Sequence, residues 1–176
     1  IFTLVPGLIF AFLVMSALPT FKKSGFKNTI KGFFKSLKNK DHLFLFLLLI
    51  YFFIVIYRTL FQRDFSYDSL SDVFGGWKIF KTQYTGLDYQ VIGNIAMFFP
   101  FGLFWALTFE REEKSAKTLL ITLLSSLCFS AFIEITQLIF SKGTFQFSDI
   151  VYNTLGGVLG ALIFIIINLI IKKKRS

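Results

Sequence analysis

Charged residues, cysteine and histidine are all scarce in this chain, and each shortage excludes a class of protein. Asp, Glu, Lys and Arg make up 16% of the 176 residues, too few to cover a soluble domain in which 55% of residues are hydrophobic. The one cysteine, Cys128, excludes an intramolecular disulfide framework and a cysteine metal site. The one histidine, His42, stands at the edge of an apolar segment, where an interfacial position is expected rather than a catalytic one.

The chain instead consists largely of long apolar segments. The mean hydropathy is +0.67, and phenylalanine alone supplies 26 residues. Segments of about 18 to 23 apolar residues have the length that crosses roughly 30 Å of hydrocarbon as helix. They predict about five transmembrane helices, over residues 1–19, 43–60, 91–109, 118–140 and 150–171. The predicted fold class is therefore all-α, a polytopic transmembrane helical bundle.

A basic segment separates the first two predicted helices. In residues 21–41, apolar side chains recur every three or four positions, and lysines lie between them. This pattern is typical of an amphipathic interfacial helix on an anionic membrane surface, which would be contacted by Lys27, Lys31, Lys35 and Lys38. A solvated cytoplasmic loop is the alternative interpretation. We expect residues 1–41 to form an N-terminal transmembrane helix with a basic linker, and residues 42–176 to form a four-helix membrane domain.

The distribution of lysine and arginine predicts an orientation. Segments 20–42, 110–117 and 172–176 would share one side of the membrane, and they hold fourteen of the nineteen basic residues. By the positive-inside rule, this multi-pass cell-membrane protein has its N-terminus outside and its C-terminus in the cytoplasm. The same rule accounts for the net charge of +9, so nucleic acid is not an expected partner. Residues 61–90 would then be extracellular, and we expect them to fold onto the outer surface, partly as short helix.

Several polar residues inside the apolar segments fall at one depth under this topology. At 1.5 Å per residue, Glu134 lies about 9 Å below the outer end of its helix and Asn153 about 6 Å below the outer end of the next. A carboxylate within an apolar span is costly, so its presence indicates a function. The predicted ligand-binding or functional polar cluster consists of Arg58, Asn94, Glu134, Gln137, Asp149 and Asn153. A hydrogen-bond cluster that only fixes packing is the alternative, although amides and hydroxyls would achieve that without two carboxylates.

Residue spacing predicts how the last two helices meet. One stripe of residues 118–140 holds, at intervals of four, four and three, Ser126, Ser130, Glu134 and Gln137. In residues 150–171, Gly156 and Gly160 form a Gly-x-x-x-Gly pair, which lets another helix backbone approach closely. We therefore expect residues 150–171 to pack tightly on residues 118–140, below Asn153.

Three motifs occur in order along the chain: NIAMFFPFG from Asn94, EITQ from Glu134 and SDIVYNTLGGVLG from Ser148. With this combination the chain, over roughly residues 42 to 171, resembles the VanZ-like family. These are small membrane proteins of Gram-positive bacteria, named after an accessory member of glycopeptide resistance clusters. The resemblance implies a part in low-level teicoplanin resistance. It also assigns the family's polar positions to Asn94, Glu134, Gln137, Asp149 and Asn153.

The chain departs from the family pattern just before Asp149. Many relatives have an arginine there, followed by two acidic residues, whereas this chain has Lys142, Gly143 and Gln146. The amide at Gln146 argues against a metal site and against an enzymatic role like that of other relatives.

Three functions agree with these features. The first is a binding protein whose outer-leaflet cavity holds an amphiphile: a membrane lipid, a lipid-linked cell-wall precursor or a lipoglycopeptide. The second is an intramembrane enzyme in which Glu134 serves as general acid or base with Asp149, but the cluster offers no nucleophile and no histidine. The third is a small transporter, which would need to be a homo-oligomer and lacks an inverted repeat. We favour the first, with neither cofactor nor metal, and expect binding without turnover.

Overall fold

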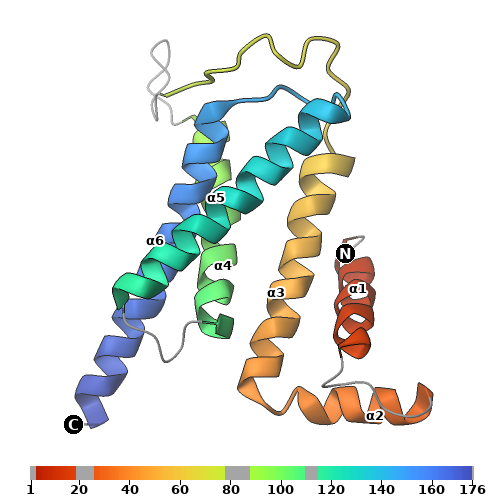
Figure 1. The fold of residues 1–176 in the computed structure, drawn as a ribbon, viewed down its shortest axis with the longest axis vertical. Helices are drawn as coiled ribbons and strands as arrows, with labels where there is room; N and C mark the ends of the chain where they lie inside the picture. The colour runs from red at the N-terminus through yellow and green to blue at the C-terminus, as the bar shows by residue number, and fades with distance from the viewer. Residues whose placement is uncertain (1–2, 19–25, 78–87, 110–114, 176) are drawn as a thin grey trace.

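The computed structural model, which describes residues 3–18, 26–77, 88–109 and 115–175, is a bundle of helices (Figure 1). Four spans of 22, 21, 25 and 28 residues are long and apolar enough to cross a membrane. They correspond to α3 (Lys40–Ile56) with the π-helical turn η1 (Tyr57–Phe61), α4 (Tyr89–Phe109), α5 (Ser115–Ile139) and α6 (Phe147–Arg175). The predicted all-α membrane bundle is confirmed.

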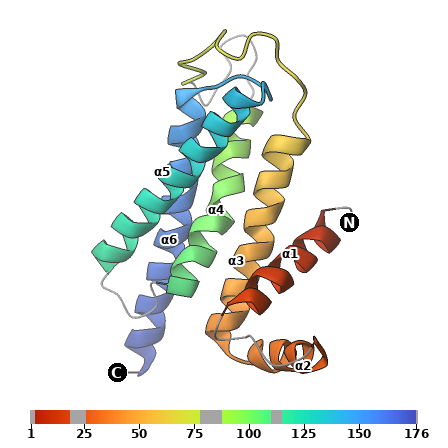
Figure 2. The same ribbon diagram turned by 45° about the vertical axis from the view of Figure 1, so that its right-hand side comes forward.

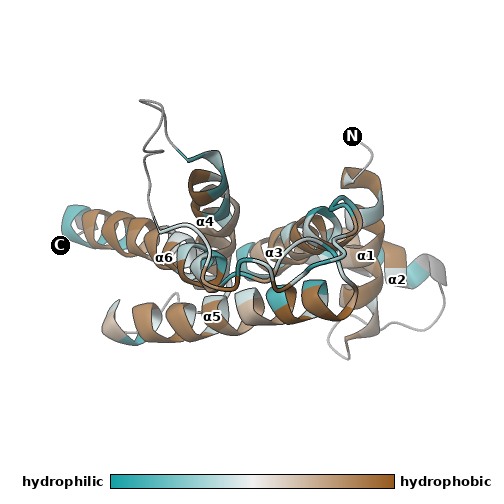
Figure 3. Ribbon diagram, turned by 90° about the horizontal axis from the view of Figure 1, so that it is seen from above, coloured by the Kyte–Doolittle hydropathy of each residue, from teal (hydrophilic) through white to brown (hydrophobic). Residues whose placement is uncertain are grey.

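The outward faces of these helices are apolar. Seen from above, brown hydrophobic residues cover most of the helix surfaces, and teal residues gather at the connections (Figure 3). On α5 and α6, large exposed apolar side chains include Leu123, Leu127, Ile135, Leu155 and Ile163. In water such a surface would be unfavourable, whereas in hydrocarbon it costs nothing to expose. The chain is a membrane protein.

The first predicted span is shorter than the other four. α1 (Leu4–Ala17) is apolar and has 14 residues, or about 21 Å of helix. It packs beside α3, where the rings of Phe10 and Phe53 lie 5.4 Å apart and Gly7 lies against Ile50. The predicted division of the chain at residue 41 stays a prediction.

The basic segment forms a separate amphipathic helix, α2 (Phe26–Ser36), which lies across the lower end of the bundle (Figures 1 and 2). On its apolar side, Phe33 is buried between the rings of Phe12 in α1 and Phe46 in α3. On the polar side, exposed lysines are Lys31, Lys35 and, just after the helix, Lys38. The side chain of Lys27 lies outside the described part of the chain. The amphipathic helix is thus confirmed, while its contact with a membrane surface stays a prediction.

Glycines bring α6 directly against α4. A Cβ atom on Gly156 would collide with the backbone carbonyl of Ile95, and one on Gly160 with the carbonyl of Phe99. Gly102 of α4 likewise has no room for a Cβ, because it faces the backbone of Gly157. The predicted packing of residues 150–171 on residues 118–140 is confirmed, but its assignment to the Gly-x-x-x-Gly pair was wrong, because that pair faces α4. Spacing explains the error: Gly157, four residues after Asn153, is the residue that continues the polar stripe, and its own Cβ would meet Ser126 of α5.

Residues 62–77, the cover segment, lie over the upper end of the bundle in Figure 1. Their backbone bonds to the loop between α5 and α6: the amide of Ser66 donates to the carbonyl of Ser141 (2.9 Å), and the amide of Gly143 to that of Asp64 (3.1 Å). Two further bonds follow, from Phe145 to Ser69 and from Phe147 to Val73 (both 2.9 Å). The segment thus folds onto the surface as expected. The short helix does not form within residues 62–77, because their backbone groups bond to the α5–α6 loop; residues 78–87 lie outside the described residues.

Candidate ligand-binding site

Five of the six predicted polar residues are buried at the upper end of the bundle. None is more than 7% exposed, and they are Asn94, Glu134, Gln137, Asp149 and Asn153. The sixth, Arg58, is exposed and lies outside this buried group. The predicted stripe on α5 is confirmed as a buried surface, because Ser126 and Ser130 are buried below Glu134.

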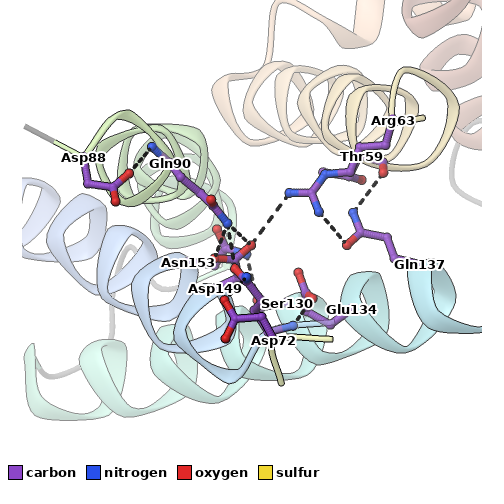
Figure 4. Close-up of polar contacts among 11 residues, drawn as sticks. Thr59, Arg63, Asp72, Asp88, Gln90, Ser130, Glu134, Gln137, Asp149 and Asn153 are labelled. Carbon is purple, nitrogen blue, oxygen red and sulfur yellow. Dashed lines mark hydrogen bonds and ion pairs between the residues drawn. The ribbon is translucent and has the colours of Figure 1, made fainter. Parts of the chain in front are cut away.

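Asp149 lies in the first turn of α6, where the helix dipole favours a negative charge. Its Oδ2 is 3.7 Å from Nη2 of Arg63, which forms an ion pair across the bundle (Figure 4). The side-chain amide of Gln90 donates to the two carboxylate oxygens at 3.3 and 3.4 Å. Asp149 itself is 3% exposed and Arg63 is 31% exposed, so the charge of a buried carboxylate is neutralised by a guanidinium that still reaches open space.

Glu134 and Gln137 occupy successive turns of α5. The carboxylate of Glu134 accepts a hydrogen bond from the backbone N–H of Gln146 at 3.1 Å. Gln137 is held at both ends: its oxygen accepts from Nη1 of Arg63 at 3.3 Å, and its nitrogen donates to the carbonyl of Thr59 at 2.9 Å. Arg63 therefore links α5 to α6 through one side chain, as Figure 4 shows.

Asn153 serves mainly to join two helices. Its side-chain nitrogen donates to the hydroxyl of Ser130 at 2.9 Å, and both residues are buried. This bond lies one turn of α6 below Asp149 and connects α6 to α5. For Asn153 the structure thus supports the packing interpretation of the polar cluster.

A cavity of about 630 Å³ lies between α3 with η1 on one side and α4 on the other. Towards the upper end its walls are polar, with Arg58, Gln62, Arg63, Gln90 and Asn94. One to two turns lower they become apolar, with Ile54, Val55, Ala96 and Met97. Among the described residues, no acidic side chain lines it. The cavity therefore has a basic, polar end and an apolar end, which follow each other along the upper parts of α3 and α4.

Comparison with known proteins agrees with this architecture. A family model described as VanZ/LLP1 matches residues 2–168. The chain belongs to the VanZ/LLP1 family. It is also similar to Protein VanZ of Enterococcus faecium, with 33% identity over 91 residues that make up 52% of this chain and 53% of that protein. The chain thus spans about half the length of this curated relative. No solved structure matches the chain.

Four side chains in this VanZ/LLP1 family member complete the cluster and were missed from sequence. They are Arg63, Asp72, Gln90 and Gln146. Gln146 is the most connected of them, because its side chain accepts from Gln90 at 2.7 Å and donates to Asp72 at 3.0 Å, while its backbone binds Glu134. The family pattern drew attention to Gln146 as a departure just before Asp149, but its partners in the network could not be read from the sequence.

The amide at Gln146 suits this network better than an acid would. It serves as acceptor to one partner and donor to another, and a carboxylate in its place would face Asp72 without a proton to donate. Within the described ranges, no three His, Cys, Asp or Glu side chains converge so as to hold a metal ion. The expectation that the protein needs no metal or cofactor stays a prediction. Chemically, the described site offers two buried carboxylates, one bridging guanidinium and hydrogen-bond donors facing the cavity.

Proposed function

We propose that this VanZ/LLP1 family protein binds an amphiphile in the cavity between α3 and α4. The observation that carries the proposal is the division of the cavity wall into a polar end with two arginines and an apolar end formed by Ile54, Val55 and Met97. A membrane lipid, a lipid-linked cell-wall precursor and a lipoglycopeptide all have both a polar and an apolar part. The volume of about 630 Å³ lies within the range of known ligand pockets, roughly 300 to 1,000 Å³.

The proposed site faces the outside of the cell. Fourteen of the nineteen lysines and arginines belong to segments 20–42, 110–117 and 172–176, and the described parts of these segments lie towards the lower end of the bundle, where α2 crosses it in Figure 1. Under the positive-inside rule that end is cytoplasmic, and the lysines of α2 lie against anionic headgroups. Single cysteines at Ser71 and Ser115, with Cys128 replaced by alanine, test this with an impermeant thiol reagent. Labelling at Ser71 alone is expected; labelling at Ser115 alone would reverse the orientation.

Binding at this site would contribute to low-level teicoplanin resistance. Two observations support this proposal. The chain belongs to the VanZ/LLP1 family, and it buries two carboxylates, which costs more free energy than burying the amides or hydroxyls that would be enough for helix packing. Expression of the chain in a susceptible Gram-positive host should raise the inhibitory concentration of teicoplanin.

The variant Glu134→Gln separates function from packing. The amide oxygen of glutamine can still accept the hydrogen bond from Gln146, so the fold should persist while the charge is lost. We expect normal expression and thermal stability with loss of protection against teicoplanin. Asn153→Ala is the matched structural control, because it removes the bond to Ser130, and its protection should fall only as far as its stability falls. Full protection by a stable Glu134→Gln protein would show that the buried charge is not needed for resistance; binding in the cavity, which Glu134 does not line, is tested separately at the lining residue Ala96.

Two measurements separate binding from the other functions. An amphiphile recovered unchanged after incubation with purified protein would distinguish a binding protein from an enzyme. Absence of flux across liposomes that contain the protein would distinguish it from a transporter. Turnover dependent on Glu134, or flux dependent on the cavity, would replace the proposed function with one of these alternatives.

A further inference from the structure

The polar end of the cavity presents hydrogen-bond donors. Arg58 lines it and makes no hydrogen bond or ion pair with any described residue. Asn94 is 7% exposed and lines the cavity; its side chain lies close to Asp149, but its nitrogen makes no well-aligned hydrogen bond with a described residue. A buried donor without a partner is costly, so a ligand atom that accepts its hydrogen bond would be favoured.

Arg63 adds a second guanidinium to the same space. It is 31% exposed, and its contacts with Gln137 (3.3 Å) and Asp149 (3.7 Å) are long. A guanidinium has five N–H donors, so most of its donor capacity remains for a ligand. Asp149 offsets one positive charge, and the second, on Arg58, has no partner among the described residues.

Both arginines lie at the upper end of α3, beside the π-helical turn η1. Arg58 is the second residue of η1, Arg63 follows two residues after the end of η1, and both side chains line one cavity. Such π-helical turns occur often at functional sites.

We infer that the polar end of this cavity binds the phosphate of an anionic amphiphile, with Arg58, Arg63 and Asn94 as its donors. A terminal phosphate has three acceptor oxygens for three donor groups, and guanidinium groups match phosphate geometry particularly well. The hydrocarbon chain then runs between Ile54 and Val55 on α3 and Met97 on α4. This inference rests on the proposed function and specifies the class of its ligand.

Binding of farnesyl phosphate to the purified full chain in a neutral detergent tests the inference. Isothermal titration should show that farnesyl phosphate binds at least about tenfold more tightly than farnesol, which lacks the charged hydrogen bonds, and more tightly than farnesoate, whose carboxylate has one negative charge and two acceptor oxygens in place of three. Inorganic phosphate should bind more weakly than farnesyl phosphate, since it lacks the chain. Equal affinity for inorganic phosphate would overturn the assignment to an amphiphile.

Arg58→Gln is the key variant, because Arg58 is exposed and its loss leaves the described fold contacts intact. It should weaken farnesyl phosphate binding about tenfold and farnesol binding hardly at all. Lys142→Gln is the matched control: it removes one positive charge at the same end of the bundle, where Lys142 lies 3.9 Å over the ring of Phe65 and does not line the cavity. Equal effects of the two variants would overturn the inference.

A cavity-filling variant distinguishes failure of this inference from failure of the proposed function. Ala96→Trp should prevent binding of every amphiphile, because Ala96 lines the apolar part of the cavity. If farnesol binds as tightly as farnesyl phosphate and Ala96→Trp abolishes both, the cavity holds an amphiphile without selecting phosphate, and the inference alone is overturned. If no probe binds in a manner sensitive to Ala96→Trp, the proposed function fails together with the inference.

Discussion

The two faces of α4 meet their neighbours in opposite ways. On one face, α6 approaches so closely that Gly102, Gly156 and Gly160 have no space for a single methyl group. On the other face, a cavity of about 630 Å³ separates α4 from α3 and η1. Gly93 belongs to this second face, and a Cβ there would meet nothing within 4 Å.

This difference separates the parts of the bundle that hold it together from the part that is available to a ligand. Helices in a membrane gain no hydrophobic energy from associating with each other, so close packing of small residues provides much of their attraction. α4 and α6 satisfy that need through their glycines. The opposite face of α4 is thus left free to border a cavity, with the hydroxyl of Tyr51 donating to the carbonyl of Met97 (2.6 Å) as a cross-link.

Substitution of Gly156 by valine should have the largest effect on stability. The new side chain would collide with the backbone carbonyl of Ile95, which no change of rotamer can relieve. We expect a loss of about 3 kcal/mol or more, seen as a lower midpoint of thermal unfolding in detergent. Gly93→Val is the matched control on the other face of α4. Equal midpoints for the two variants would mean that the contrast between the faces is wrong.

The next largest effect is expected from Ala96→Trp, which fills the cavity and should abolish the increase in stability that a bound ligand gives. Farnesyl phosphate at a hundredfold excess over its dissociation constant should stabilise the wild-type protein by about 2.7 kcal/mol. Ala96→Trp should keep most of the stability of the ligand-free protein and lose this increment, because the indole occupies ligand space. Thermal unfolding with and without the ligand gives both quantities. An undiminished increment in the variant would show that the ligand binds elsewhere.

Removing the cross-link between α3 and α4 should have a smaller effect. Tyr51→Phe deletes one hydrogen bond to Met97, which is worth about 1 kcal/mol. Chemical denaturation should detect this difference. Tyr57→Phe, on the same helix, provides the control, because the Tyr57 hydroxyl makes no hydrogen bond with the described residues. A Tyr51→Phe protein as stable as this control would show that the cross-link contributes nothing.

Gly93→Ala should have the smallest effect, and it should be stabilising. Alanine is favoured over glycine within a helix by up to about 1 kcal/mol, and open space surrounds this position. The unfolding midpoint should therefore rise slightly, whereas Gly102→Ala, the same change on the face of α4 that meets α6, should lower it. A fall in both variants would show that Gly93 also makes a contact.

The membrane-spanning helices and the gathering of polar residues towards one end of the bundle could be predicted from sequence, whereas their depth in a membrane stays a prediction. Both depend on segment length and on the position of charges at segment ends, which are visible without a structure. The burial of Glu134 and Asp149 follows from their positions inside apolar segments. The inclusion of Arg58 in the cluster was only partly right, because it borders the cavity while Arg63 makes the ion pair.

The remaining features could not be predicted because they depend on distant partners. The spacing from Asn153 could have assigned Gly157 to the polar stripe, but the contact of Gly156 with Ile95 depends on how α4 packs on α6. The role of Arg63 depends on its contacts with Gln137 and Asp149, which lie 74 and 86 residues further along the chain. Asp72 and Gln146 find each other across 74 residues, in segments without regular spacing.

The cover segment also has a consequence for biosynthesis. Its backbone partners, between Ser141 and Phe147, follow it in the chain by about seventy residues. During synthesis, residues 62–77 reach their final compartment before their partners are made. Their backbone groups therefore stay without these hydrogen-bond partners until α4 and α5 have been inserted. Gly75, whose φ of 69° brings it against Ser148 at the start of α6, can take its place only then. The polar cluster is thus completed only by the α5–α6 hairpin: a chain that stops short of α6 has helices α1 to α5 and the walls of the cavity, but it lacks Asp149, the ion-pair partner of Arg63.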